Sequence, residues 1–204
     1  MKYRTIYADP PWMESGGGGR GANAHYQLMK AKEIIALAPM VKELAEDNAH
    51  LYLWTTNNFL PDALAVMKAW GFRYITTITW MKNQMGLGQY FRGLTEHCLF
   101  GVRGKLPYKV IDGKRQQGKT GLFEKKREHS RKPVQMREMI EKVSYPPFIE
   151  LFARERFDGW DAWGNEICFT GKTRTADRSI CASVNQTAQM NLAEDARKAS
   201  ISGN

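Results

Sequence analysis

Residues 5–12 read Thr5-Ile6-Tyr7-Ala8-Asp9-Pro10-Pro11-Trp12, and they indicate the fold class. Thr5 to Ala8 has the β-branched and apolar residues of a buried strand, and two prolines then end any regular element. Open α/β sheets bind their ligands in the loops that follow the carboxyl ends of strands. The segment therefore predicts a buried strand followed by a stiff loop that holds an acid and an indole beside a cleft.

Similar strand-forming runs recur along the chain and alternate with helical patterns. The runs are His50–Thr55, Ile75–Trp80, His97–Val102 and Phe148–Ala153. Several are apolar on both faces, which is typical of strands in a buried, largely parallel sheet. Apolar residues at spacings of three and four lie between them, within residues 34–45, 60–67 and 136–143. We predict an α/β fold with a mostly parallel sheet, helices on both of its faces and one antiparallel edge strand.

The positive charge of the chain is concentrated in one segment. Thirty Lys and Arg residues against 21 Asp and Glu give a formal net charge of +9. Residues 103–132 contain eleven of the basic residues and three of the acidic ones, so nearly all of the net charge lies there. A concentrated basic segment is typical of proteins that bind nucleic-acid phosphates, although a solvated loop kept soluble by its charge has the same composition.

The remaining composition narrows the class of protein. A chain of 204 residues with 43% hydrophobic content can bury one core. Three cysteines without a CxxC pair and four histidines without ligand spacing indicate neither a disulfide framework nor a metal site. No run approaches a membrane span or a signal peptide, so we expect a cytoplasmic protein. We expect one domain over residues 1–169, a mobile glycine-rich loop at residues 15–24 and a polar, flexible tail at residues 170–204.

The loop Asp9-Pro10-Pro11-Trp12 suits methylation of an amino group on a base. Adenine N6 is a poor nucleophile because its lone pair is delocalised into the ring. The Asp9 carboxylate and the Pro10 carbonyl would accept both N–H groups and so localise that lone pair for attack on a sulfonium methyl. Trp12 would offer a stacking face to the base. A turn that ends a strand and carries an incidental aspartate is the structural alternative.

The chain resembles the MT-A70 family of adenine-N6 methyltransferases over about residues 3–167. The likeness rests on the segments YADPPW, HYQLM, LYLWTTN, ITWMKN, EHCLFGVRG, HSRKP, IELFARE and WGNE. It implies a single Rossmann-like methyltransferase domain of bacterial or phage type, with S-adenosylmethionine as the cofactor. It also implies a circularly permuted motif order, in which the catalytic DPPW comes before the cofactor segment.

The resemblance implies roles for individual residues. Asp9 would receive the adenine amine and lie near the methionine amine of the cofactor, and Lys132 would meet the cofactor carboxylate. Further cofactor residues would be Glu150, Arg154, Arg156, Asn165 and Glu166. Residues facing the nucleic acid would be Tyr26, Tyr90 and Arg92. The basic segment adds the phosphate contacts Lys114, Arg115, Lys119, Lys125, Lys126 and Arg127. One departure is that Phe152-Ala153-Arg154 replaces the FxGxG turn of the wider methyltransferase class.

Residues 113–120 (GKRQQGKT) match the phosphate-loop pattern GxxxxGK[ST]. Such a loop must leave a buried strand and open an amphipathic helix whose amino end holds the phosphates. The residues after Thr120 offer no apolar helical face. We therefore interpret the match as a contact to a nucleic-acid backbone and not as a nucleotide-hydrolysis site.

Several functional alternatives follow from the same residues. DNA is favoured over RNA as the substrate because a compact basic chain resembles the bacterial or phage branch of the family. A catalytically inactive nucleic-acid-binding subunit is one alternative, and methylation of a small amine or of a protein Asn or Gln is another. Because relatives pair two similar domains, a homodimer is a further expectation of the resemblance.

Overall fold

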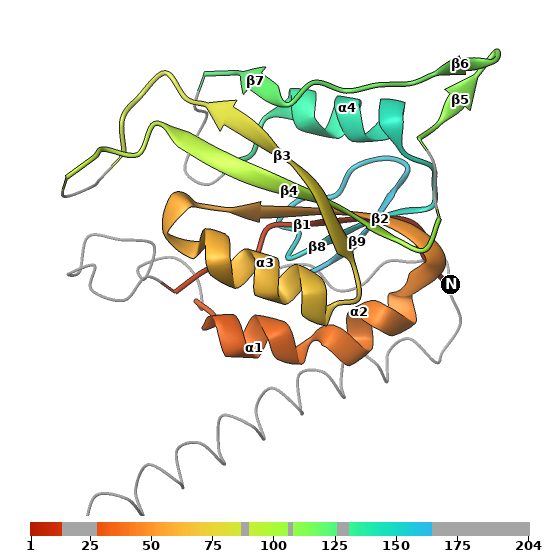
Figure 1. Ribbon diagram of the computed structural model, residues 1–204, viewed down its shortest axis with the longest axis horizontal. Helices are drawn as coiled ribbons and strands as arrows, with labels where there is room; N and C mark the ends of the chain where they lie inside the picture. Colours follow the sequence, from red (N-terminus) through yellow and green to blue (C-terminus); the bar gives the residue numbers. More distant parts are fainter. Residues whose placement is uncertain (14–27, 87–89, 106–107, 126–130, 165–204) are drawn as a thin grey trace, which may run out of the picture.

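The computed structural model describes residues 1–13, 28–86, 90–105, 108–125 and 131–164 (Figure 1). Its central seven-stranded sheet has the order β7-β3-β4-β2-β1-β8-β9. The strands of this sheet are β1 (Tyr3–Ala8), β2 (Ala45–Thr55), β3 (Arg73–Met81), β4 (Thr95–Arg103), β7 (Gly121–Phe123), β8 (Phe148–Leu151) and β9 (Trp160–Trp163). A separate hairpin is formed by β5 (Val110–Ile111) and β6 (Lys114–Arg115). The helices are α1 (Ala31–Ala36), α2 (Ala38–Leu44), the 3₁₀ turn η2 (Asn57–Phe59), α3 (Leu60–Ala69) and α4 (Val134–Val143).

Helices cover both faces of the sheet, which confirms the predicted α/β architecture. The helices α1, α2 and α3 lie on one face and α4 lies on the other (Figure 1). On the first face, Ile34, Val66 and Trp70 are fully buried in the same core as strand residues of β1 and β2. On the second face, Met136 and Ile140 of α4 are fully buried in a second, aromatic-rich core. The apolar helical spacings therefore correspond to the buried faces.

The antiparallel strand lies inside the sheet, so its predicted position at an edge was wrong. β4 pairs antiparallel with both β2 and β3. The pairs β1–β2, β1–β8, β8–β9 and β3–β7 are parallel. β7 adds beside β3 and β9 adds beside β8, and neither strand was predicted from the sequence. The carboxyl ends of β1, β2, β3 and β8 and the amino end of β4 consequently meet at one end of the sheet.

The single helix expected within residues 34–45 is in fact two helices followed by a strand. α1 ends at Ala36 and α2 begins at Ala38, with Pro39 in its first turn. A proline is tolerated there because the first backbone N–H groups of a helix have no partner within the helix. Ala45 begins β2 and does not end a helix, so β2 starts well before the predicted His50.

Two expected segments lie outside the described residues, namely the glycine-rich loop at residues 15–24 and the tail at residues 170–204. Among the helices that are described, none combines the length and the apolar character needed to cross a membrane.

Candidate active site

Asp9 is fixed at the carboxyl end of β1, between the ends of β2 and β8. Its backbone N–H donates to the Leu151 carbonyl of β8 at 3.4 Å. The two prolines after it lead to Trp12, which bridges in parallel to Met29. The Met29 N–H donates to the Pro11 carbonyl at 2.8 Å, and the Met13 N–H donates to the Met29 carbonyl at 3.0 Å. The loop is thus tied on both sides, and the Asp9 carboxylate has a defined position.

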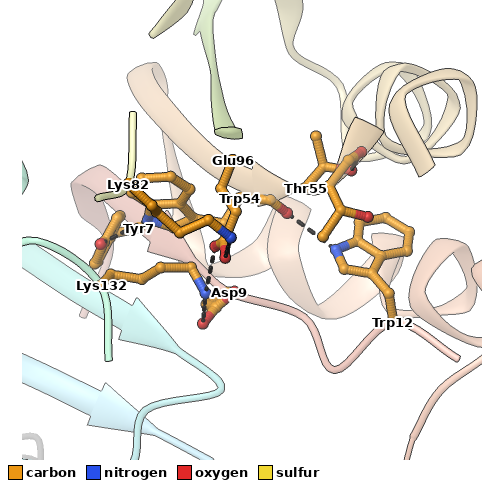
Figure 2. A network of polar contacts seen from close by, with 9 residues as sticks. Tyr7, Asp9, Trp12, Trp54, Thr55, Lys82, Glu96 and Lys132 are labelled. Carbon is orange, nitrogen blue, oxygen red and sulfur yellow. Dashed lines mark hydrogen bonds and ion pairs between the residues drawn. The ribbon is translucent and has the colours of Figure 1, made fainter. Parts of the chain in front are cut away.

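A chain of alternating charges begins at Asp9 (Figure 2). The Lys132 ammonium donates to Asp9 Oδ2 at 2.6 Å and lies 3.5 Å from Glu96 Oε2. The Lys82 ammonium donates to Glu96 Oε1 at 2.9 Å. The four side chains are only 11 to 21% exposed. They come from the end of β1, the segment before α4, β4 and the end of β3, so the fold brings together charges that are far apart in sequence.

Aromatic side chains lie beside this charge cluster, among them Trp54 and Tyr7 (Figure 2). The Lys132 ammonium lies 5.4 Å from the ring centroid of Trp54, and the Lys82 ammonium lies 5.8 Å from that of Trp80. The Trp54 indole N–H donates to the Tyr7 hydroxyl at 2.7 Å. Cations are attracted to the faces of indole rings, most strongly where water is excluded. The two tryptophans are buried and also stabilise the lysines.

Opposite charges keep Glu96 and Lys132 ionised despite their burial. Burial favours a raised pKa for Glu96, yet Lys132 and Lys82 outweigh it and hold that pKa below its ordinary value. Burial favours a lowered pKa for Lys132, and Asp9 and Glu96 outweigh it in turn, so the pKa of Lys132 is raised. Both groups are therefore charged near neutral pH.

We expect the free energy of unfolding of Glu96→Gln to fall less on acidification than that of wild type. The folded pKa of Glu96 lies below its unfolded value of about 4.3, so the carboxylate stabilises the fold above that pH and ceases to do so as the pH falls through the folded pKa. The variant should be less stable than wild type by about 2 kcal/mol at pH 7, and this difference should shrink towards pH 3. Urea unfolding from pH 3 to 7 measures it, with the exposed Glu43→Gln as control. A difference that does not change with pH would contradict the expectation.

Trp12 and Pro10 already have interaction partners within the protein. The Trp12 indole N–H donates to the Trp54 carbonyl at 3.0 Å, and its ring stacks on Phe59 with centroids 5.4 Å apart and an interplanar angle of 17°. One face of Trp12 is therefore covered by Phe59. The Pro10 carbonyl accepts the Trp12 backbone N–H at 2.9 Å. A carbonyl oxygen has two lone pairs, so one acceptor site on Pro10 remains for a ligand.

Glu150 lies beside the Asp9 strand and has an arginine partner. It pairs in register with Tyr7 of β1, and its Oε2 accepts a bond from Arg137 Nη2 at 2.7 Å. The Arg137 guanidinium lies 3.6 Å from the ring centroid of Phe157 and 4.8 Å from that of Trp160. Burial raises the pKa of Glu150, and Arg137 only partly offsets this. Arg137 was not predicted from the sequence, although its spacing of three before the buried Ile140 was a signal that it faces the sheet.

The two segments expected to bind the cofactor, IELFARE and WGNE, meet after β8 and β9. The Ala153 N–H donates to the Trp163 carbonyl at 3.0 Å. A Cβ atom on Gly164 would overlap the Ala153 backbone, so a glycine is required for this contact. Phe152 has φ of 62°, in the left-handed region that non-glycine residues seldom adopt. The turn that stands in place of the FxGxG turn therefore depends on a strained backbone at Phe152. Asn165 and Glu166 lie outside the described residues.

The other predicted site residues lie at varied positions. Arg154 is close enough to Lys132 to act against the rise in its pKa, whereas Arg156 is exposed. Tyr90 is 93% exposed in the loop between β3 and β4. Arg92, in the same loop, donates from Nε to the Gly86 carbonyl at 3.0 Å. Tyr26, Lys126 and Arg127 lie outside the described residues.

The structure does not bring Lys114 and Arg115 to Asp9. They form β6 of the hairpin, whose base is attached to the end of α4 by the Lys109 N–H donating to the Val143 carbonyl at 2.8 Å. This is the end of the domain opposite the charge cluster (Figure 1). Residues 121–123 form strand β7, so no helix follows Thr120 directly. The structure thus confirms that GKRQQGKT is not a phosphate loop.

Comparison with known proteins assigns the family. The profile of the MT-A70 family matches residues 3–166. The chain belongs to the MT-A70 family. It is similar to the type II methyltransferase M.MunI of a Mycoplasma species, with 34% identity over 188 residues that cover 81% of this chain and 78% of that enzyme.

Eukaryotic MT-A70 proteins are also similar to the chain. The human N(6)-adenosine-methyltransferase catalytic subunit METTL3 is 27% identical over 181 residues, which cover 81% of this chain and 28% of that protein. The Arabidopsis thaliana N6-adenosine-methyltransferase non-catalytic subunit MTB is 27% identical over 113 residues, which cover 50% of this chain and 14% of that protein. The chain thus spans about a quarter or less of the length of these two relatives.

The segments that carry the MT-A70 resemblance converge on the charge cluster. YADPPW supplies Asp9, HSRKP supplies Lys132, ITWMKN supplies Lys82 and EHCLFGVRG supplies Glu96. Asp9 and Lys132 were predicted from the sequence as site residues, whereas Lys82 and Glu96 were not. The available signal was that each is a single charged residue at the end of an otherwise uncharged strand run. Among the described residues, no cluster of three or more His, Cys, Asp and Glu side chains could hold a metal ion.

Proposed function

We propose that the chain transfers a methyl group from S-adenosylmethionine to the N6 amine of adenine in nucleic acid, with DNA as the preferred polymer. The observation that carries this proposal is the buried pair between Asp9 of the DPPW loop and Lys132, 2.6 Å apart, in a member of the MT-A70 family. Asp9, Pro10, Pro11 and Trp12 form the catalytic loop.

The donor set at the cluster suits the amino-acid end of S-adenosylmethionine, which carries one carboxylate and one ammonium. Lys132 would hold that carboxylate, and Asp9 would lie near the ammonium. Replacing a buried ion pair by a zwitterion leaves every charge compensated, which a neutral ligand would not do. Glu150 and Arg154 would line the ribose side, together with Arg156 and the Asn165-Glu166 pair. When bound, the cofactor supplies an electrophilic methyl group.

The DPPW loop would hold the adenine amine for attack. Asp9 accepts one N6 hydrogen, and the free lone pair of the Pro10 carbonyl accepts the other. Asp9 orients the amine and is not a strong base, because the nitrogen proton becomes acidic once the methyl group is attached. The face of Trp12 that Phe59 leaves open would stack on the base. Tyr26, Tyr90 and Arg92 would contact the nucleic acid around it.

Two other functions are weighed against this proposal. MTB, one of the relatives, is named as a non-catalytic subunit, which supports a non-catalytic role as the second candidate. A protein that only binds nucleic acid has no need of the buried Asp9–Lys132 pair, which favours catalysis. RNA is the alternative polymer, because METTL3 is named as an adenosine methyltransferase. The match over 78% of the Mycoplasma enzyme favours the bacterial branch and hence DNA.

Isothermal titration with S-adenosylmethionine separates catalysis from scaffolding. We expect one binding site per chain and methyl transfer to duplex DNA that exceeds transfer to RNA of equal length. A chain that binds mixed-sequence DNA but gives no heat with S-adenosylmethionine would be a non-catalytic subunit, and the proposal would be rejected. Methylation of RNA alone would overturn the choice of DNA.

We expect Arg137→Met to shift the pH dependence of cofactor affinity to higher pH. Burial raises the pKa of Glu150, with Asp9 and Glu155 adding to the rise, and Arg137 opposes it. Without Arg137 the carboxyl group should stay protonated to a higher pH, so the fall in S-adenosylmethionine affinity on acidification should begin at a higher pH than in wild type. The change is at most tenfold per pH unit. Titration calorimetry measures it.

Two variants control the Arg137→Met experiment. Arg137→Lys keeps the positive charge and should restore the wild-type profile. Arg137→Met combined with Glu150→Gln has no carboxyl group to titrate at this position and should lose the shift. If Arg137→Met alone gives the wild-type profile, Arg137 does not act through Glu150.

A further inference from the structure

Residues 109–125 of the basic segment form a track along one side of α4 (Figure 1). It starts at the β5–β6 hairpin beside the carboxyl end of α4, where the Lys109 ammonium donates to the Glu141 carbonyl at 3.1 Å. It then passes the middle of the helix, because the Lys119 N–H contacts the Met139 sulfur at 3.2 Å. A Cβ atom on Gly118 would lie 2.8 Å from the same sulfur, so the segment packs tightly on α4. The track therefore has a defined path.

The other end of the track lies at the charge cluster. β7 pairs with the carboxyl end of β3, and the Glu124 carbonyl accepts the Trp80 indole N–H at 2.8 Å. The Glu124 carboxylate accepts the backbone N–H groups of Val134 and Gln135, both at 3.3 Å, at the amino end of α4. Lys125 follows directly and is exposed. The segment thus connects the catalytic end of the domain with the opposite end, as Figure 1 shows.

The exposed groups along the track suit a nucleic-acid strand. Lys114, Arg115, Lys119 and Lys125 are all exposed. Of the acids within residues 109–125, Glu124 is engaged at the helix end, which leaves Asp112 at the hairpin turn. Phe123 is 73% exposed at the catalytic end and offers a stacking face. Positive groups interleaved with an exposed aromatic ring are typical of surfaces that follow a phosphate backbone and its bases.

We propose that the β5–β6 hairpin is a distal phosphate clamp. It holds the part of the bound nucleic acid that extends from the catalytic end of the domain along α4. The inference rests on the proposed function for the position of the target base. The ten residues of α4 span about 15 Å and the hairpin adds roughly 10 Å. At about 3.4 Å per base pair, this distance corresponds to roughly seven base pairs. The clamp gives affinity without reading sequence, because phosphates are common to all sequences.

The test is the salt dependence of binding to a mixed-sequence 24-base-pair duplex, measured by fluorescence anisotropy from 50 to 200 mM salt. The variant is Lys114→Gln with Arg115→Gln. The loss of two phosphate contacts should make the dependence of log affinity on log salt less steep by about 1.8. Between 50 and 200 mM salt, wild type should therefore lose about tenfold more affinity than the variant. The control is Lys42→Gln with Lys68→Gln, two exposed lysines of α2 and α3, and its slope should equal that of wild type.

Catalysis distinguishes failure of the clamp from failure of the proposed function. The hairpin variant should keep its kcat and its S-adenosylmethionine affinity, and its KM for long DNA should rise several-fold. A slope equal to that of the control variant overturns the clamp even if methylation is intact. A hairpin-dependent slope in a wild-type chain that methylates nothing would keep the clamp and reject the enzyme. If the free chain assembled through the hairpin, and the salt slope of DNA binding were the same in the hairpin variant as in wild type, the hairpin would be a protein interface. That result would overturn the clamp.

Discussion

Replacing Asp9 by alanine should abolish methyl transfer and leave the protein folded. The carboxylate is the proposed acceptor of the N6 hydrogen, and the Pro10 carbonyl alone offers a single remaining lone pair. Removing one precisely placed hydrogen-bonding group from an active site typically costs 10²–10³ in rate, and we expect at least about 10³ here because Asp9 also faces the cofactor amine. Methyl transfer with radiolabelled S-adenosylmethionine measures the loss.

The fold should survive the Asp9 substitution because Lys132 has a second partner. The Lys132 ammonium lies 3.5 Å from Glu96, so it is not left as a buried charge without compensation. Circular dichroism and the melting temperature should be close to those of wild type. Asp47→Ala, on an exposed part of β2, serves as a matched control and should keep full activity. Activity of Asp9→Ala within about tenfold of wild type would rule out the proposed mechanism.

Replacing Lys132 by methionine should weaken S-adenosylmethionine binding by roughly 30-fold or more. The ammonium is the proposed partner of the cofactor carboxylate in a largely buried site, where removing one member of a charged pair costs roughly 2–5 kcal/mol. Every 1.4 kcal/mol is a tenfold change in the dissociation constant. The loss also leaves Asp9 and Glu96 as two acids without the cation between them. Titration calorimetry measures the affinity.

Lys82→Met provides the matched comparison for Lys132→Met. Lys82 is bound to Glu96, whereas Lys132 contacts both Glu96 and Asp9. The loss of Lys82 should therefore reduce cofactor affinity by a smaller factor than the loss of Lys132. Lys132→Arg should keep part of the affinity, because a guanidinium retains the charge but not the compact shape of an ammonium. Wild-type affinity in Lys132→Met would show that the cofactor carboxylate is held elsewhere.

The strand that positions Asp9 could be predicted because its signals are local. An apolar run that ends at two prolines indicates a buried strand and the loop after it without knowledge of the other strands. Helices on both faces followed from apolar residues at helical spacing. These features depend on patterns within one element.

Contacts between distant elements could not be predicted in the same way. Lys132 and Asp9 are 123 positions apart, and their ion pair depends on the strand order that places the segment before α4 above the end of β1. The Lys82–Glu96 pair depends on β3 and β4 being antiparallel neighbours inside the sheet, and this position of β4 was predicted wrongly. Arg137 reaches Glu150 only because α4 packs on β8. The roles of these residues remain predictions.

The most direct test uses S-adenosylmethionine with a trideuterated methyl group, incubated with the purified chain and DNA that lacks methylated adenine. Nucleosides from the digested DNA are then analysed by mass spectrometry. The account predicts trideuteromethyl on N6 of deoxyadenosine with the wild-type chain and none with Asp9→Ala. A label on cytosine, or an equal label on deoxyadenosine with the Asp9→Ala chain, would contradict it.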